Sequence, residues 1–194
     1  MSAQDVEALL ASVTDLARRV FGAAACSLAL LEADDEHLLF HAATGAGAGE
    51  VVGLRLPVDR GIAGWVVSSG QPIAVSDVRA DPRFAVDVAE STGYVPRVIL
   101  AAPVTAGGEP LGVVEVLDPR PDVPDPLDLL AVLAAHAALV VAAADRAAAE
   151  APPDPRVVLH ELLRLGPAEQ RAAADLLAAF LASLGRSSGP AGLV

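Results

Sequence analysis

The sequence predicts an α+β domain built on an antiparallel sheet, and three observations lead to that prediction. Helical patterns open the chain and return from Leu127 to Arg146, with short apolar runs between them. Two of these runs flank the turn sequence TAGGEP, whose paired glycines favour a tight hairpin. The stretch from Gly53 to Asp118 places a strand, a short helix, a short strand and a second short helix before that hairpin. This order is typical of a ligand-sized cavity on one face of a sheet.

The first helix is expected to begin after Ser2 and to end near Phe21. Ser2 with Asp5 resembles a capping pair, in which each side chain satisfies a free backbone N–H group of the first turn. Apolar residues then recur at helical spacing as far as Gly22. The chain therefore opens with an amphipathic helix that has one face available for the core.

Three strands are predicted after this helix. Cys26–Glu32 and His37–Ala43 are apolar runs separated by an acidic turn, which indicates a hairpin. The glycine-rich stretch TGAGAGE follows as a flexible connection. Val51–Leu56 then alternates between apolar and other residues and is predicted to be the third strand.

Two short helices and a brief strand are predicted in the centre of the chain. Gly61–Ser69 begins with a glycine and is followed by another, which suits a short helix. Ile73–Val75 is the brief strand. Asp81 followed by Pro82 predicts the start of a second helix, running to about Gly93. Asp can cap free N–H groups there, and Pro needs no N–H in the first helical position.

A hairpin and an Ala-rich helix complete the predicted domain. Arg97–Val104 and Leu111–Leu117 are the two strands of the hairpin. The proline-rich sequence PRPDVPDP breaks the chain before the helix Leu127–Arg146. This helix has little polar surface over its middle turns, so we expect it to have two neighbours, the sheet and another helix.

The sequence beyond this helix predicts an appendage to a single domain. We expect the domain to span residues 1–149, a Pro-rich linker 150–155, a helical hairpin 156–185 and a disordered tail 186–194. The hairpin faintly resembles a DNA-binding helix-turn-helix, but its second helix carries Ala and Leu where base-reading side chains would be needed. An association hairpin that docks on the domain or on another subunit is the favoured interpretation.

The amino-acid composition narrows the classes of partner that we expect the protein to bind. The net charge is −12, from 25 acidic and 13 basic residues, and every basic residue is Arg. Such a surface repels nucleic acids and anionic membranes, and we expect neither as a partner. The chain is 54% hydrophobic but 3% aromatic, so a pocket should have aliphatic walls.

The protein is expected to be soluble and cytoplasmic. Cys26 is the single cysteine, which excludes an internal disulfide framework, and no signal segment opens the chain. The apolar run closest in character to a membrane span, Leu127–Ala144, is interrupted by Asp128 and His136 and is rich in weakly hydrophobic Ala.

Several short sequence words in the first 149 residues occur in a recognisable order. They are LP at 56–57, GIAGWV at 61–66, GQPI at 70–73, DV at 77–78, DPRF at 81–84, APV at 102–104 and GVVEV at 112–116. In combination they resemble the GAF domain family, a group of small-molecule-binding relatives of PAS domains. The resemblance covers roughly residues 3 to 149 and is specific as a combination, although each word is weak alone.

The resemblance implies an antiparallel sheet of about five or six strands. The terminal helices would lie on one face, where they could extend into a homodimer interface or a contact with a partner protein. A pocket would lie on the other face, roofed by the segment from Gly61 to Gly93. The residues implied to bound this pocket are Trp65, Val75, Asp77, Phe84, Tyr94, Ile99 and Glu115.

Departures from the family narrow what the pocket could hold. Members bind cyclic nucleotides, bilins, haem, oxoacids or other small molecules, and some bind nothing known. Bilin carriers need a cysteine near the pocket, and relatives that reduce free methionine sulfoxide need several. Here Cys26 stands in a predicted first strand. The Asn-Lys-Phe-Asp-Glu signature of phosphodiesterase relatives is absent, since the chain has no Lys. The cofactor or ligand therefore stays unnamed.

Cysteine and histidine have structural interpretations that compete with functional ones. Cys26, in an apolar strand, is more typical of a small buried residue than of a redox sensor. His37 and His41 share a face of the predicted strand near acidic residues, but a strand spacing of four separates them too far for easy metal ligation. For His136, a position at a helix interface is a better interpretation than haem ligation.

Polar and aromatic residues around the predicted roof are also ambiguous. Asp81 is assigned first to helix capping, whereas Asp77 could equally orient a ligand or shape the loop. Trp65 and Tyr94 are the single residues of their types and are candidates for ligand stacking, or for packing in the core or roof.

The function predicted from the sequence is that of a regulatory sensor which binds a small molecule non-covalently. No nucleophile elbow, P-loop, zinc spacing or dinucleotide fingerprint occurs, so we expect no enzyme. Two alternatives remain open: a pocketless assembly protein, and a regulator with a degenerate C-terminal helix-turn-helix.

Overall fold

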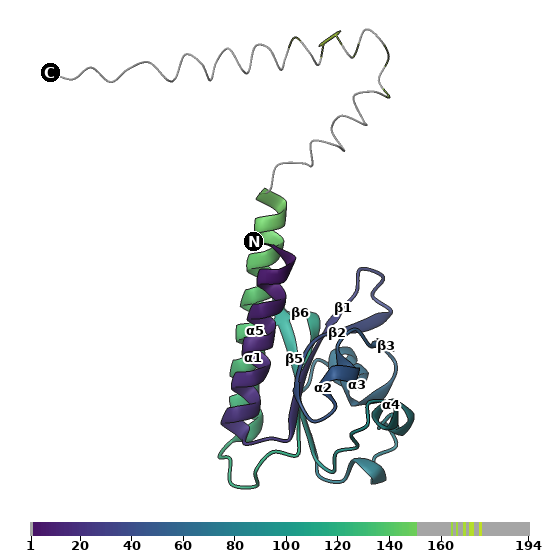
Figure 1. Ribbon diagram of the computed structural model, residues 1–194, viewed down its shortest axis with the longest axis vertical. Coiled ribbons are helices and arrows are strands. Elements are labelled where there is room, and N and C mark those ends of the chain that lie inside the picture. Colours follow the sequence, from purple (N-terminus) through teal and green to yellow (C-terminus); the bar gives the residue numbers. More distant parts are fainter. Residues whose placement is uncertain are drawn as a thin grey trace, which may run out of the picture. The chain divides into compact units, whose positions relative to one another are not determined.

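The computed structural model of the protein (Figure 1) describes residues 2–150 and, beyond them, residues 164, 166, 169, 171, 172 and 175. The elements are α1 (Ala3–Phe21), β1 (Ala25–Leu31), β2 (His37–Gly45), α2 (Ala48–Val51), β3 (Arg55–Pro57), α3 (Gly61–Ser69), β4 (Ile73–Val75), the 3₁₀ helix η1 (Val78–Ala80), α4 (Val86–Ser91), β5 (Ile99–Ala106), β6 (Glu109–Leu117) and α5 (Pro126–Glu150). The predicted linker after residue 150, and nearly all of the predicted hairpin and tail, lie outside the described residues.

The strands of this described part form one six-stranded antiparallel sheet in the order β3-β2-β1-β6-β5-β4. The α+β fold with a central antiparallel sheet is confirmed. β1 and β6 lie at the centre, each with a neighbour on both sides, and their burial is nearly continuous. The β5–β6 turn uses Gly107 and Gly108, which both have positive φ angles of 61° and 91°.

The predicted helix at the N-terminus has the expected ends. The Ser2 side chain accepts a hydrogen bond from the N–H of Asp5, and the Asp5 carboxylate accepts one from the N–H of Ser2. These reciprocal bonds form a capping box. Gly22 ends α1 in the left-handed conformation, with φ of 55°.

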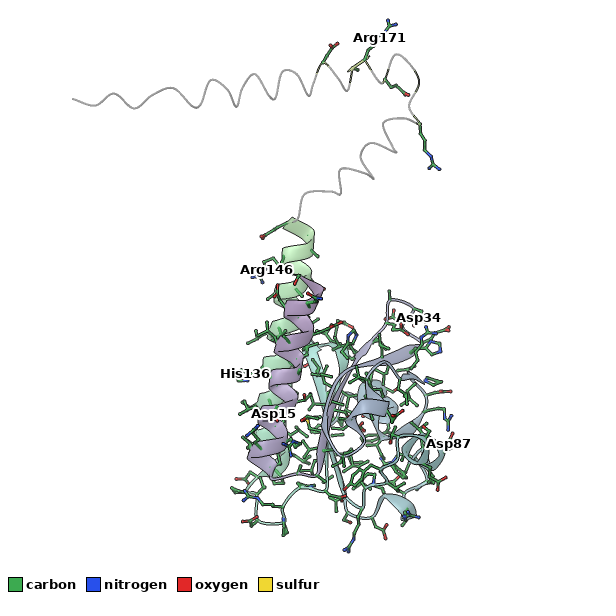
Figure 2. All side chains as sticks on the ribbon, viewed as in Figure 1. Asp15, Asp34, Asp87, His136, Arg146 and Arg171 are labelled. Carbon is green, nitrogen blue, oxygen red and sulfur yellow. The ribbon has the colours of Figure 1, made fainter. Side chains whose placement is uncertain are left out.

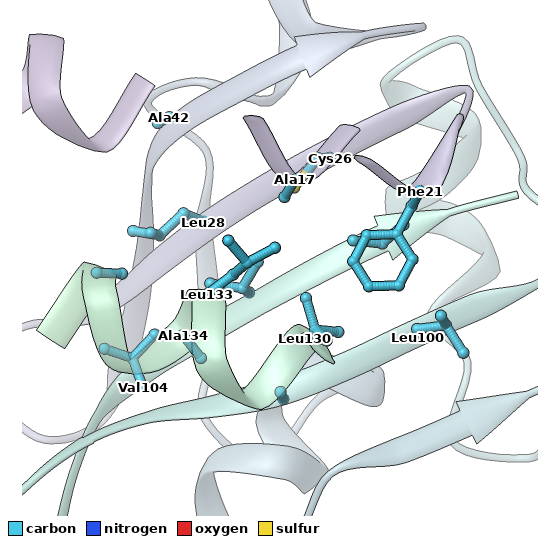
Figure 3. Packing of buried hydrophobic residues seen from close by; sticks show 14 of the residues in the cluster. Ala17, Phe21, Cys26, Leu28, Ala42, Leu100, Val104, Leu130, Leu133 and Ala134 are labelled. Atoms are coloured by element: carbon cyan, nitrogen blue, oxygen red, sulfur yellow. The ribbon is translucent and has the colours of Figure 1, made fainter. Parts of the chain in front are cut away.

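α1 and α5 lie side by side and run in opposite directions on one face of the sheet (Figure 1). Their inner sides share a hydrophobic cluster with the strands, shown in Figure 3. Ala17 and Phe21 come from α1, Leu130 and Leu133 from α5, and Leu28 from β1. α5 therefore has the two neighbours that its apolar composition predicts.

α5 is long and apolar enough to span a bilayer by length and composition, with a mean hydropathy of 2.2 in its most apolar window, of which 28% is buried. It is the one such helix among the described residues. Asp128 and His136 do not lower the hydropathy of this helix below that range, and a single helix of this kind is weak evidence of a membrane span. The face that carries Leu130, Leu133 and Ala137 packs into the core.

The opposite face of the sheet is covered by α3 and the segments around it. Ile62, Ala63 and Val66 of α3 pack with strand residues in a second hydrophobic cluster. Gly64 lets α3 approach the preceding loop, because a Cβ at this position would lie 2.3 Å from the carbonyl oxygen of Val58. The bounds of α3 and β4 are those predicted.

The third predicted strand was placed wrongly. Residues 48–51 form the short helix α2, and Gly53 turns the chain with φ of 87° before β3 begins at Arg55. A strand of six residues and a helical turn followed by a short strand show similar apolar alternation, so periodicity does not separate them. The predicted flexible TGAGAGE segment instead contributes the end of β2 and the start of α2.

The second central helix was also placed wrongly. Asp81 does not cap it, because its carboxylate accepts hydrogen bonds from the backbone N–H and the guanidinium of Arg83 at 2.6–2.9 Å. α4 begins five residues later, at Val86, and has no side-chain cap. The local bond between neighbouring residues has replaced the helix start that Asp-Pro predicts.

Candidate functional site

A cavity of about 100 Å³ lies on the sheet face opposite α1 and α5, beneath α3, α4 and the segments beside them. Its walls are predominantly aliphatic, as the composition predicts. They include Leu54, Leu56, Ile62, Val88, Ile99 and Leu117. In this conformation the volume is about a third of the lower limit of roughly 300 Å³ for drug-sized ligand sites.

Few polar groups face this cavity, and Glu115 is the ionisable one in its floor. Glu115 stands on the central strand β6 and is only 9% exposed. Ser27, directly opposite on β1, has its hydroxyl 3.4 Å from the Glu115 carboxylate, a long hydrogen bond. Burial raises the pKa of Glu115 to about 7, and the Ser27 hydroxyl opposes this shift weakly.

Tyr94 also lines the cavity, but its hydroxyl group has a structural partner. It donates a hydrogen bond to the carboxylate of Asp118, which also accepts from the backbone N–H groups of Arg97 and Val98 at 2.9 and 2.8 Å. Desolvation, with the nearby Asp118 charge, raises the pKa of Tyr94 to about 12. The Tyr94 ring is therefore available to a ligand, whereas its hydroxyl holds the chain to the end of β6.

The structure brings four of the seven predicted pocket residues to the cavity and leaves three elsewhere. Phe84, Tyr94, Ile99 and Glu115 line it. The other three are Trp65, Val75 and Asp77.

Each of these three misses the cavity for a geometric reason. Val75 is buried in the second hydrophobic cluster beside Ile99 and does not line the cavity. Asp77 is exposed and caps nothing with its side chain. Trp65 is half-buried at the edge of the second hydrophobic cluster and lines an outer groove beside α3.

This outer groove, of about 580 Å³, lies next to the cavity and shares Gly61, Phe84 and Ala85 with it. Arg83 lies over the Trp65 ring at 4.6 Å from its centre, within the range of a cation–π contact. Figure 2 shows Asp87 on the side of the molecule away from α1 and α5. Phe84 and Ala85 thus lie between the cavity and the outer groove.

Two ion pairs hold the segment between the cavity and the groove. Arg60, just before α3, lies 2.8 Å from the carboxylate of Asp87 on α4. Arg83 lies 2.6 Å from the carboxylate of Asp81 and lowers the pKa of that group. Arg60 and Asp87 are largely exposed, so solvent screens this pair and it contributes little to stability.

Sequence reasoning missed several cavity residues. Ser27 and Phe40 lie on predicted strands, and the register Ser27↔Glu115 follows once β1 and β6 are known to be neighbours. That pairing joins strands 88 residues apart, and no local pattern reveals it. Ala85, Ala89 and Thr92 were missed because α4 was displaced along the chain.

The other candidate residues occupy ordinary structural positions. Cys26 is buried in the helix-side core, and burial raises the pKa of its thiol, which makes it unreactive. His136 is exposed on α5, with Nδ1 2.8 Å from the carbonyl oxygen of Val132 (Figure 2). The pairing of β1 with β2 skips His41, which forms a bulge in β2.

An acidic group at the β1–β2 turn has the composition of a metal site. Ligand atoms of Glu32, Asp34 and His37 lie within 4.8 Å of one another. Arg55 of β3 contacts both carboxylates, and His37 Nδ1 lies 2.9 Å from the Asp34 carboxylate. These charges are therefore paired within the protein.

The six-stranded sheet, the paired terminal helices and the cavity together have the architecture of a GAF domain. The family model described as GAF domain matches residues 5–141, and the chain belongs to the GAF domain family. Domains of this family are small-molecule and signalling sensor modules and are generally regulatory, although some occur with or as enzymes.

Curated relatives include phosphodiesterases. The chain is 28% identical over 125 residues to the "Probable 3',5'-cyclic phosphodiesterase pde-5" of Caenorhabditis elegans, covering 58% of this chain and 17% of that protein. It is 45% identical over 58 residues to the cone cGMP-specific 3',5'-cyclic phosphodiesterase subunit alpha' of Mus musculus, covering 30% and 7%. The chain thus spans less than a fifth of the length of these two relatives.

Solved structures share the fold. The GAF domain of a phosphoenolpyruvate-protein phosphotransferase from Coxiella burnetii has a TM-score of 0.65 at 24% identity, covering 74% of this chain and 86% of that one. Free methionine-R-sulfoxide reductase from Neisseria meningitidis, solved in complex with its substrate, has a TM-score of 0.60 at 21% identity, covering 75% and 83%. At these identities the likeness shows the fold alone.

Proposed function

We propose that the protein is a GAF-type regulatory module that binds a small molecule non-covalently and passes its presence on through the terminal helices. The observation that carries the proposal is the cavity, in which aliphatic walls surround one buried carboxyl group. Binding sites for small molecules combine an apolar lining with a few convergent polar groups in this way.

The size of the cavity determines whether a ligand can bind without movement of the roof. About 100 Å³ accommodates a molecule of a few heavy atoms, and a larger ligand requires the roof to move outward. The segment from Asp81 to Ser91 is suited to that movement, since it contains only the short helix α4 and one exposed ion pair, Arg60–Asp87, joins it to the start of α3. A ligand that binds one roof position better than another would shift the population between them.

The output surface in this proposal is an apolar stripe on α1 and α5. Leu16 on α1 is 51% exposed, and Val132 and Leu139 on α5 are 53% and 68% exposed. Leu9 and Val20 extend the stripe on α1, because residues seven or eleven apart fall on the same side of a helix. We propose that this stripe forms a homodimer interface, which would also cover His136.

A second candidate, an assembly protein that binds no small molecule, is favoured by the same stripe together with the small cavity. The two candidate functions predict different effects of a substitution at Ala89. Ala89 lines the cavity from α4, so Ala89→Trp would fill the space that a ligand needs. If the protein is an assembly protein that binds no small molecule, the same substitution has no ligand to displace.

A thermal-shift screen with matched variants tests the sensor proposal. The screen covers cyclic nucleotides, haem, oxoacids and amines, with wild type, Ala89→Trp and the control Ala80→Trp, whose residue is exposed in η1. The sensor proposal expects at least one compound to raise the Tm of wild type and Ala80→Trp but not of Ala89→Trp. Stabilisation by none of the classes would leave the assembly function.

A further inference from the structure

Among the described residues, the ionisable side chains that line the cavity include an acid but no base. No Arg, Lys or His lines it in the described part of the chain, and the one ionisable carboxyl group among its walls is that of Glu115. Arg60 and Arg83 line the outer groove instead, where they are paired with Asp87 and Asp81. An anionic ligand in the cavity would therefore meet a carboxyl group and no cationic side chain.

The Glu115 carboxyl group has spare hydrogen-bonding capacity. A carboxylate can accept about four hydrogen bonds. Within the described residues, the one it accepts is the 3.4 Å bond from the Ser27 hydroxyl. On the other side β5 places Ala101 opposite Glu115, and alanine offers no polar side-chain atom. Burying a polar group without partners costs free energy, which a donor brought by a ligand would recover.

Other polar groups of the cavity are already engaged. The Thr92 hydroxyl donates to the carbonyl oxygen of Ala89 at 2.8 Å, and the Tyr94 hydroxyl donates to Asp118. A ligand would therefore find Glu115 as its strongest polar anchor and aliphatic side chains around the rest of its surface.

We propose that the cavity takes a small organic cation, an alkylammonium or amidinium group on a short apolar body, whose charged N–H donors bind the Glu115 carboxylate. This inference rests on the proposed sensor function and names the ligand class for the same site. Charge-assisted hydrogen bonds of this kind are about twice as strong as neutral ones. The short apolar body would contact side chains such as Ile62 and Ile99.

Binding should depend on pH through Glu115. With a pKa of about 7, Glu115 is largely protonated at pH 6 and largely ionised at pH 8. A cation needs the ionised form, so its affinity should fall about tenfold between pH 8 and pH 6.

We attribute the pH dependence of ligand affinity to Glu115 itself, after considering the other ionisable groups around it. From β1, the Cys26 thiol has its pKa raised well above this range, and Tyr94 titrates near 12. Asp118 is held by Tyr94 and two backbone N–H groups. On α4, Asp87 and Glu90 are exposed, and α3 carries no ionisable side chain.

A matched series of probes tests the ligand class. Propylammonium, propan-1-ol and propionate have nearly the same size and differ in charge. We would measure their dissociation constants by NMR titration of the full chain, for wild type, Glu115→Gln and the control Glu109→Gln. Glu109 is exposed on the same strand β6.

The expected result is that propylammonium binds wild type and Glu109→Gln most tightly of the three at pH 8, and about tenfold more weakly at pH 6. Glu115→Gln should lose about tenfold or more in affinity and lose the pH dependence. Gln keeps the shape of the acid, so the variant is expected to fold.

Three outcomes would overturn the inference: propionate or propanol binding as tightly as propylammonium, unchanged affinity in Glu115→Gln, or no binding of any probe. These outcomes are separable from failure of the sensor function. If another compound stabilises wild type but not Ala89→Trp, the sensor function stands and the cationic ligand class is wrong. If no compound does so either, both are wrong.

Discussion

At the scale of single residues, Glu115 couples the stability of the domain to pH. Its pKa is raised from 4.5 to about 7 by burial, so the folded state binds more protons than the unfolded state between these values. Stability conferred by the protonated form is therefore present at low pH and declines as pH rises through that interval. The lowered pKa values of Asp81 and Asp87 act in the opposite direction and at lower pH.

Glu115→Gln should abolish this decline. Gln resembles the protonated acid, so the variant and wild type should have similar free energies of unfolding near pH 5. By pH 8 the variant should be more stable by roughly 3 kcal/mol, at 1.36 kcal/mol per pKa unit. Urea unfolding across this pH range measures the difference, with Glu109→Gln as the control. An equally steep decline in Glu115→Gln would show that another group is responsible.

The cavity residues show what the sequence can predict at this scale. Phe84 and Glu115 lie in sequence words that resemble the GAF family, Tyr94 and Ile99 lie between such words, and all four line the cavity. Trp65 lies in such a word too, yet side-chain direction on α3 depends on which side faces the sheet. Whether these residues bind a ligand stays a prediction.

At the scale of elements, the glycines at the ends of α3 predicted its boundaries, whereas the glycine-rich TGAGAGE segment and the Asp81 capping signal were misleading. α3 lies between Arg60 and Gly70 as predicted, because Gly64 permits a close contact that fixes the helix against Val58. Asp81 failed as a helix cap because Arg83 is two residues away and competes for its carboxylate. A cap is predictable only when no nearer donor is available.

The Arg60–Asp87 pair should control the mobility of α4. Arg60→Gln removes a largely exposed pair, so the midpoint of global unfolding should change little. Amide hydrogen exchange in residues 86–91 should nevertheless accelerate about two- to fivefold, because α4 loses its tie to α3. Arg19→Gln, which breaks the Arg19–Asp15 pair on α1, serves as the control. Unchanged exchange in α4 would show that the pair does not restrain the roof.

At the scale of the whole molecule, the apolar stripe on α1 and α5 predicts self-association. Leu139→Glu should weaken the dimer about tenfold or more, because an unpaired charge in an apolar interface costs several kcal/mol. Val52→Glu is the matched control, since Val52 is 52% exposed but lies outside both helices. Light scattering over a concentration series measures the change. A monomeric wild type, or equal effects of both substitutions, would contradict the dimer.

The overall architecture was predictable because its signals are local or belong to the family pattern: a capped amphipathic helix, one hairpin around an acidic turn, one around a glycine turn, and an apolar last helix. The cavity volume was not, because it depends on how closely Phe84, Ala85 and Ala89 approach the sheet. That distance results from packing between segments far apart in the sequence. The sequence also did not show which side of α5 is exposed, because Val132 and Leu139 on the exposed side are as apolar as the residues on the buried side.

The central claim, that a small molecule occupies the cavity between the sheet and the roof, is tested most directly by the isoleucine δ1-methyl NMR spectrum. The chain contains three isoleucines, of which Ile62 and Ile99 line the cavity and Ile73 does not. On titration with propylammonium or a compound that raises the Tm, the signals of Ile62 and Ile99 should shift with saturation while that of Ile73 stays in place. A shift of Ile73 alone, or of no isoleucine at a concentration that raises the Tm, would contradict a ligand in this cavity.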